Sequence, residues 1–359
     1  MIDIDTNIQQ IRRNCDISDA AHAGLFSICG LALRLRDLYK WEHNLPPWVE
    51  KDSSEILDWI GKKEQLWEQI AANDYERITL SGNQYDPFDT ETINAVLANS
   101  NLFYGAGYAR SLKPTFFLAE IKEKRDINGH TIYILSRELA RDLLTLPAMT
   151  QDGKIILREE SARFYLWDQL IYINQSGRPA LHFALSCAGL HDFGPENLKQ
   201  HLEILFEKQK NIFIRHEIGE LNDTVFDTTL WREIIASFPH SPIELFARAV
   251  KDLLADTHPD GTLCALIAEQ NEIGIGFYAA FQTGFLKTVF PEIQAVFPEF
   301  ARTRQWRLIL QANESGRQTA IRYAQEMITI FQQGKQSRGL KWAGDQILKK
   351  LINPLIQKN

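Results

Sequence analysis

Residues 195–221 read PENLKQHLEILFEKQKNIFIRHEIGEL, and this stretch predicts one long amphipathic α-helix. Leu198, Leu202 and Leu205 recur every three or four residues, the spacing that places side chains on one face of a helix. Pro195 suits the first helical turn, where its missing amide proton is not needed. A helix of this length with one apolar face is expected to pack against other helices.

The rest of the second half of the chain repeats this pattern. Further helices are expected at about residues 158–175, 179–190, 242–256, 262–290, 297–315 and 318–333. Glycine or proline separates them, as at Gly177, Pro239 and Gly316. We therefore predict a C-terminal helical bundle in residues 151–359.

Residues 1–150 are expected to form a smaller helical N-terminal domain that carries one β-hairpin, so the predicted fold class is mainly α. Apolar residues at helical spacing predict helices at about 18–42 and 52–70. The hairpin is placed at 116–135, because two apolar runs flank Asn128-Gly129, a pair that tolerates the positive φ angles of a tight turn. Another helix is predicted at 136–146, and the turn-forming residues 147–153 are interpreted as the domain boundary.

Composition narrows the classes of function. The 359 residues include 39 Lys and Arg against 46 Asp and Glu, and this acidic balance argues against nucleic acid as a partner. A basic stretch at 335–358 is interpreted as a solvated helix face. No apolar run reaches the roughly 20 residues that a membrane span needs, and no secretory signal opens the chain. The four cysteines lack CxxC spacing, which is typical of reduced thiols, so we expect a soluble cytoplasmic protein.

The candidate site consists of polar residues that the 195–221 helix turns toward the core. The leucine stripe, continued at the same spacing, reaches His216. A neighbouring stripe through Phe206 and Phe213 reaches Glu217 and Glu220. His216 and Glu220 are one helical turn apart and can reach one ion. An inward carboxylate needs a partner, because an unpaired buried charge is costly or shifts its pKa.

Other predicted helices offer further ligands. Glu160 and Glu269 continue apolar faces, and Asp256 follows Asp252 by one turn at the end of its helix. Carboxylates and imidazoles from four helices are how bundles build di-iron or di-manganese centres, since these ions favour such ligands. The sequence thus predicts a metal site, with iron or manganese as cofactor, from Glu160, His216, Glu217, Glu220, Asp256 and Glu269.

A purely structural role is the alternative interpretation. Di-iron bundles usually carry two Glu-x-x-His pairs, whereas this chain has a single His-Glu-x-x-Glu. In this interpretation the glutamates pair with Arg163 or Arg215, His216 donates to a backbone carbonyl, and Glu269 satisfies a helix end.

Three stretches resemble an uncharacterised bacterial protein family: RDLYKWE at 36–42, RHEIGE at 215–220 and KDLLADT at 251–257. The resemblance covers most of the chain. It implies no activity, because none is assigned to that family.

Two functions of different classes are therefore expected. The first is an enzyme or sensor whose buried metal site activates oxygen or water. The alternative is a non-catalytic interaction or assembly module that binds another protein or itself. A small-molecule pocket between the two halves of the chain is a third hypothesis.

Overall fold

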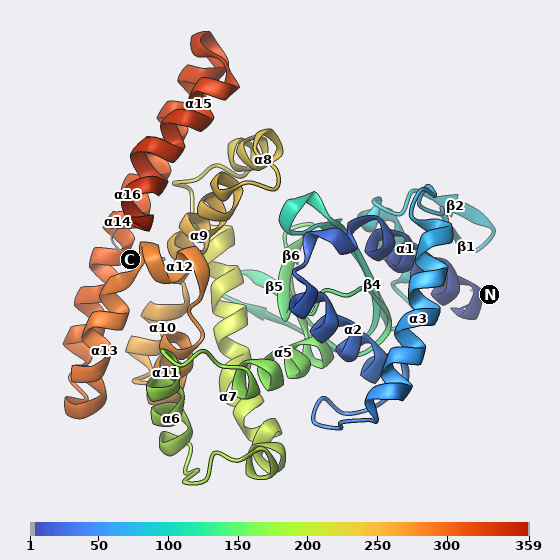
Figure 1. The fold of residues 1–359 in the computed structure, drawn as a ribbon, viewed down its shortest axis with the longest axis horizontal. Helices are drawn as coiled ribbons and strands as arrows, with labels where there is room; N and C mark the ends of the chain where they lie inside the picture. The colour runs from blue at the N-terminus through green and yellow to red at the C-terminus, as the bar shows by residue number, and fades with distance from the viewer. Residues whose placement is uncertain (1–3, 358–359) are drawn as a thin grey trace. The chain divides into compact units, whose positions relative to one another are not determined.

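The computed structural model describes residues 4–357, and side chains from residue 6 onward. The chain divides into two compact units, an N-terminal unit that ends at Asp168 and a C-terminal unit that begins at Gln169 (Figure 1). The described part of the N-terminal unit is built around a β-sheet. The described part of the C-terminal unit is helical.

A curled five-stranded sheet organises the N-terminal unit. Its strands lie in the order β3 (Leu102–Tyr108), β4 (Pro114–Ile127), β5 (His130–Arg141), β7 (Lys154–Arg158) and β6 (Ala148–Gln151). Neighbouring strands are antiparallel except β5 and β7, which are parallel. The β4–β5 pairing shifts register between Leu118 and Glu123, and such bulges bend a sheet, so the strands form a half-barrel.

Helices and a small hairpin surround this sheet: α1 (Ile4–His22), α2 (Ile28–Glu42), α3 (Ser53–Ile70), β1 (Ile78–Leu80), β2 (Asn83–Tyr85), α4 (Thr90–Leu97) and α5 (Glu159–Ile171). Helix α1 packs on β4, β5 and α3, while α4 packs on β3. Phe116 and Leu118 of β4 join the core under α1 and α4, whereas Phe117 and Ala119 join a second core with β7. Both faces of β4 are therefore buried there, as period-two alternation requires.

The predicted fold class is wrong for the N-terminal part. The strands flanking Asn128-Gly129 do form, but they are two of five in a mixed sheet rather than one hairpin on a helical domain. The helix predicted at 136–146 is absent, because β5 continues to Arg141. Residues 148–151 form β6, and Asp152-Gly153, both with positive φ, turn the chain into β7.

Buried charges explain why these strands escaped detection. The side chains of Glu138, Arg141 and Arg158 are fully buried and form one ion cluster. Arg158 donates from Nε and Nη2 to the Glu138 carboxylate, both at 2.9 Å, and its guanidinium lies 4.2 Å from the centre of the Phe117 ring. A strand whose inward residues are charged lacks the alternation of apolar and polar residues that marks strands.

A second buried ion cluster surrounds Lys113, immediately before β4. Its Nζ lies 2.9 Å from Asp19 Oδ1 and 3.1 Å from Asp142 Oδ2, and donates to Ser18 Oγ at 3.0 Å. Ser111, in the turn that delivers Lys113, has φ 60°, a left-handed conformation that strains a residue other than glycine. The cluster therefore holds a strained turn against α1.

The free edge of β3 is closed by side-chain amides. Asn94 of α4 donates to Tyr104 O at 2.8 Å and accepts from Tyr104 N at 2.9 Å. Gln151 of β6 accepts from Ala106 N at 3.1 Å and donates to Tyr104 O at 3.2 Å. These two amides stand in for the backbone of a neighbouring strand, and the Gln151 contacts join the two ends of the curled sheet.

Helices make up the described C-terminal unit: α6 (Arg178–Cys187), α7 (Pro195–Asn222), α8 (Thr228–Ser237), α9 (Pro242–Asp256), α10 (Thr262–Ala268), α11 (Glu272–Ala280), α12 (Gly284–Val289), α13 (Pro291–Thr303), α14 (Trp306–Gln333), α15 (Leu340–Ile347) and α16 (Asn353–Ile356), with π-helical turns at Gly334–Arg338 and Leu348–Ile352. Helix α7 packs against α9, α10 and α11. Across residues 4–357, no helix has the length and apolarity to cross a membrane.

Candidate functional site

The candidate site lies where the C-terminal parts of α7 and α9 pack together. Gly219 of α7 makes this approach possible, since a Cβ there would lie 2.1 Å from the backbone oxygen of Ala255 in α9. Three residues before Gly219, His216 occupies the adjoining turn of α7. The missing side chain thus lets an imidazole on one helix reach carboxylates on the next.

His216 is bonded to Asp256 and faces Asp252. Its Nδ1 lies 2.8 Å from Asp256 Oδ1, while its Nε2 lies 4.0 Å from Asp252 Oδ1. The other oxygen of Asp256 accepts a hydrogen bond from the Tyr278 hydroxyl of α11 at 3.0 Å. Asp256 is therefore held from two sides, whereas the Asp252 side chain remains 44% exposed.

Lys251 occupies the neighbouring position on α9. Its Nζ donates to Glu220 Oε1 at 2.7 Å and lies 3.9 Å from the centre of the Trp231 ring on α8. Arg248, one turn earlier, donates to Glu244 Oε1 at 2.9 Å. Lys251 and Arg248 of α9 therefore each form an ion pair with a glutamate. Within the described residues, neither forms an ion pair with Asp252.

The electrostatics of the site follow from burial and close carboxylates. Burial lowers the pKa of His216, but Asp256, Asp252 and Glu217 outweigh it and hold that pKa well above 6.5, so the imidazole is protonated at neutral pH. Burial raises the pKa of Asp252 to about 6, with His216 opposing the rise and Glu220 adding to it. An accessible carboxyl that titrates near neutrality beside an imidazolium can hold a cation or exchange a proton.

The structure brings some of the sequence-predicted ligands together and places others elsewhere. His216, Glu217, Glu220 and Asp256 share the α7–α9 contact. Glu269 is exposed at the end of α10, because the helix predicted over 262–290 breaks at Asn271, whose side chain caps α11. Glu160 belongs to the N-terminal unit, where it accepts from Glu138 N at 2.7 Å. Within residues 4–357, no group of three or more His, Cys, Asp or Glu could hold a metal ion.

Three residues of the site are absent from the predicted ligand set. Asp252 was signalled by its four-residue spacing from Asp256, which stacks the two carboxylates on one face of α9. The sequence could have pointed to Lys251, because it is adjacent to Asp252. Its partner Glu220, however, lies 31 positions away on α7. Tyr278 carried no signal, because it lies in an almost wholly apolar helix.

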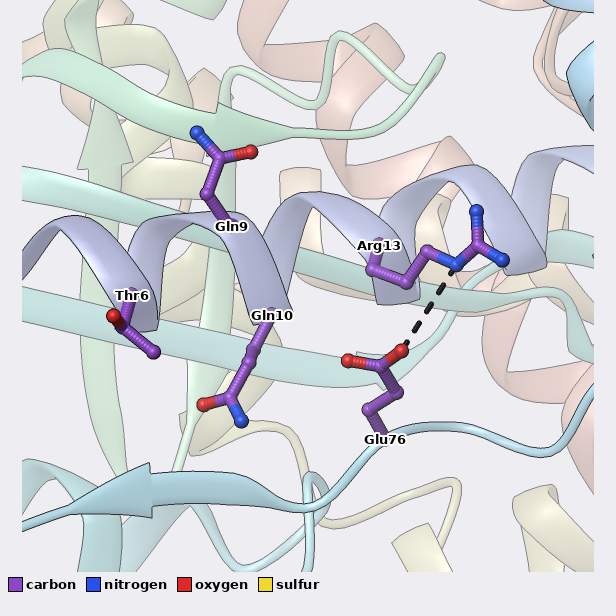
Figure 2. A pocket seen from close by; sticks show the side chains of 5 residues that line it. All are labelled: Thr6, Gln9, Gln10, Arg13 and Glu76. Atoms are coloured by element: carbon purple, nitrogen blue, oxygen red, sulfur yellow. Dashed lines mark ion pairs between the residues drawn. The ribbon is translucent and has the colours of Figure 1, made fainter.

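A hollow at the surface of the N-terminal unit is not a comparable site. It is open, has a volume of about 540 Å³, and is lined by Thr6, Gln9, Gln10, Arg13 and Glu76 (Figure 2). The Gln10 amide is already bonded to Thr79, and Arg13 Nε lies 3.9 Å from Glu76 Oε1. The two charged side chains that line it, Arg13 and Glu76, are both partly exposed, at 33% and 48%.

Comparisons with known proteins identify the chain only at the level of a family. Residues 6–158 match the model of the N-terminal domain of a family of unknown function, DUF6866. Residues 163–350 match the model of the C-terminal domain of the same family. No curated protein and no solved structure matches the chain. The resemblance to a family without an assigned activity is thereby confirmed. Because the second model alone matches more than half of the chain, the chain belongs to the DUF6866 family of unknown function.

Proposed function

We propose that the C-terminal unit binds a ligand through a cationic group, a primary ammonium, which pairs with Asp252 beside His216. The observation that carries this proposal is the Asp252 carboxylate itself. It is 44% exposed, and its nearest cationic atom in the described residues, His216 Nε2, is 4.0 Å away. A contact of that length leaves both carboxylate oxygens free to accept hydrogen bonds from an ammonium.

The charges around Asp252 favour the same class of ligand. Five carboxylates, those of Glu217, Glu220, Glu244, Asp252 and Asp256, surround three cations, His216, Arg248 and Lys251, of which Arg248 is paired with Glu244. Lys251 is committed to Glu220, and His216 is shared between the two aspartates. An added cation would offset the remaining negative charge, whereas an anion would be repelled.

Ligand binding should depend on pH, because only the ionised carboxylate pairs with an ammonium. Burial places the pKa of Asp252 at about 6. Affinity is therefore expected to rise as the pH increases from 5 to 7.5 and then to level off, while the ammonium of an alkylamine stays charged throughout.

Butylammonium titrated into the full chain and followed by the NMR signals of His216 and its neighbours would test the proposal. A saturable shift is expected at pH 7.5, with at least about tenfold weaker binding at pH 5. The shift should be lost in Asp252→Asn and retained in the matched control Asp345→Asn, which removes an exposed carboxylate of α15. A shift that persists in Asp252→Asn, or no saturable shift in the wild type, would overturn the proposal.

The iron or manganese hypothesis has weaker support. A metal ligand must be a neutral imidazole, whereas the pKa of His216 is held well above 6.5 by Asp256 and its neighbours after burial has lowered it. Mn²⁺ added in a parallel titration distinguishes the two ligands. Broadening confined to His216 and Asp256 would favour the metal over the ammonium.

Association with another protein or a second copy is a second proposed function, supported by one observation. Ile28, the first residue of α2, is 89% exposed. An apolar side chain this exposed gains about 1.5–3 kcal/mol if a partner covers it.

The four free cysteines support a reducing, cytoplasmic location for either function. Size-exclusion chromatography of the wild type and of Ile28→Ser would test association. A larger species in the wild type that is absent from Ile28→Ser would support it. Elution of both proteins as monomers would contradict self-association.

A further inference from the structure

The imidazole of His216 has one nitrogen that is held and one that is open. Nδ1 is bonded to Asp256 Oδ1 at 2.8 Å, so the ring cannot turn toward Asp252 without breaking that bond. Nε2 therefore stays 4.0 Å from Asp252 Oδ1, which is longer than a hydrogen bond of about 2.7–3.2 Å. In the part of the chain that the structure describes, the imidazole makes no hydrogen bond besides the one to Asp256.

Both members of this unbonded pair are open to a ligand. The His216 side chain is 25% exposed, and the Asp252 side chain is more exposed still. Lys251 and Arg248, the other cations of α9 nearby, each pair with a glutamate. A ligand that reaches Asp252 therefore meets an imidazole nitrogen directly beside the carboxylate.

The imidazole is supported from behind. Asp256 is buried, and its second oxygen accepts a hydrogen bond from the Tyr278 hydroxyl at 3.0 Å. Burial lowers the pKa of His216, but the neighbouring carboxylates, Asp256 first, hold that pKa well above 6.5, so Nε2 carries a proton at neutral pH. A hydroxyl oxygen accepts a hydrogen bond from the protonated nitrogen and can donate to the neutral one, so a hydroxyl suits Nε2 in either state.

The distance between the two open groups limits the ligand. Two parallel hydrogen bonds, one from each group, would place the two ligand atoms about as far apart as the 4.0 Å between Nε2 and Oδ1, and converging bonds would place them closer. A nitrogen and an oxygen on adjacent carbons are separated by three bonds of about 1.5 Å, which span roughly 3–4 Å. This spacing matches the pair formed by His216 and Asp252.

We propose that the ligand of this site is an amino alcohol with its ammonium and hydroxyl groups on adjacent carbons, whose ammonium pairs with Asp252 and whose hydroxyl bonds to His216 Nε2. This inference rests on the proposed ammonium site and adds a second contact, which selects among ammonium ligands. His216 determines specificity, while Asp256 and Tyr278 position its ring.

Paired NMR titrations of the full chain at pH 7.5 test the second contact. Ethanolamine should bind about tenfold more tightly than ethylammonium, because a hydrogen bond to a charged group is added to the same ion pair. Propanolamine, which has one further carbon between its amine and its hydroxyl, should lose most of that gain. The nitrogen signal of His216 Nε2 should move further with ethanolamine than with ethylammonium.

A peptide that begins with serine carries the same adjacent ammonium and hydroxyl groups. Its affinity, compared with that of a peptide that begins with alanine, distinguishes the two sources of this chemistry. A preference for the serine peptide would assign the ligand to a polypeptide N-terminus, whereas a preference for ethanolamine alone would assign it to a free amino alcohol.

Variants separate the two contacts. In His216→Phe the preference for ethanolamine over ethylammonium should fall to about onefold, whereas the matched control His201→Phe, on the same helix, should keep it. Asp252→Asn should abolish the binding of both ligands. If His216→Phe does not fold, the three amines in the wild type still decide the question.

The outcomes distinguish this inference from the proposed function. Equal affinities of ethanolamine and ethylammonium in the wild type, or an undiminished preference in His216→Phe, would overturn the amino alcohol and leave the ammonium site standing. No saturable shift with either ligand would overturn both.

Discussion

Replacing Lys113 by methionine should lower the free energy of unfolding by about 3–5 kcal/mol, because it leaves two buried carboxylates without their cation. Lys113, Asp19 and Asp142 have side chains at most 1% exposed, so water cannot take over the role of the ammonium. The ion pairs also hold the strained turn at Ser111. Urea unfolding of the full chain, followed by tryptophan fluorescence and circular dichroism, measures the change.

The pH dependence of this variant separates lost charge from lost packing. Without Lys113, both carboxyl groups should have raised pKa values in the folded state, so the deficit should shrink as the pH falls from 7 to 4 and they become protonated. Lys62→Met, at an exposed position of α3, should change the free energy of unfolding by less than about 0.5 kcal/mol. A loss below about 1 kcal/mol in Lys113→Met would contradict the assigned role.

Gly219→Ala should destabilise the protein by about 3 kcal/mol and disconnect His216 from Asp256. The new Cβ would lie 2.1 Å from the backbone oxygen of Ala255, and a backbone atom cannot rotate away as a side chain does. Helix α7 must therefore move from α9. The pKa of His216, now held well above 6.5 by the α9 aspartates against the effect of burial, should fall, which an NMR titration of its imidazole would record.

Gly61→Ala provides the matched control for this substitution. Gly61 lies inside α3, and a Cβ there would meet no atom within 4 Å. Helix propensity alone then stabilises the variant by up to about 1 kcal/mol. If Gly219→Ala were also stabilising, or left the His216 titration unchanged, the close approach of α7 and α9 would not be what positions the imidazole.

Local sequence signals located single helices and turns but not the sheet. The spacing of Leu198, Leu202 and Leu205 reported α7 correctly, because a helix buries a face that is periodic along the chain. The second half of β5 and the strand β7 were missed, because Glu138 and Arg158 are ion-pair partners 20 residues apart and no local pattern reveals a buried ion pair. The sheet is therefore defined by pairing between strands that are distant in the sequence, which local patterns do not reveal.

The candidate site shows the same limit. The one-turn spacing on α7 and on α9 indicates which residues share a helix face, and these faces do meet in the structure. What the acids do there depends on competing partners. Lys251 takes Glu220, and Tyr278 supports Asp256, because α8, α9 and α11 fold around α7. The distances between helices that decide this were not available from spacing alone.

The closed edge of β3 has a consequence for how copies of this chain can meet. An open strand edge accepts any extended segment that offers the complementary row of amides and carbonyls, which is the route to edge-to-edge aggregation. Here the Asn94 and Gln151 amides already occupy the polar groups of Tyr104 and the amide of Ala106. A strand from another copy could pair with β3 only after displacing the side-chain amides of Asn94 and Gln151. Assembly of this chain should therefore proceed through side-chain surfaces, and conditions that unfold α4 should be the ones that turn β3 into a template for fibres.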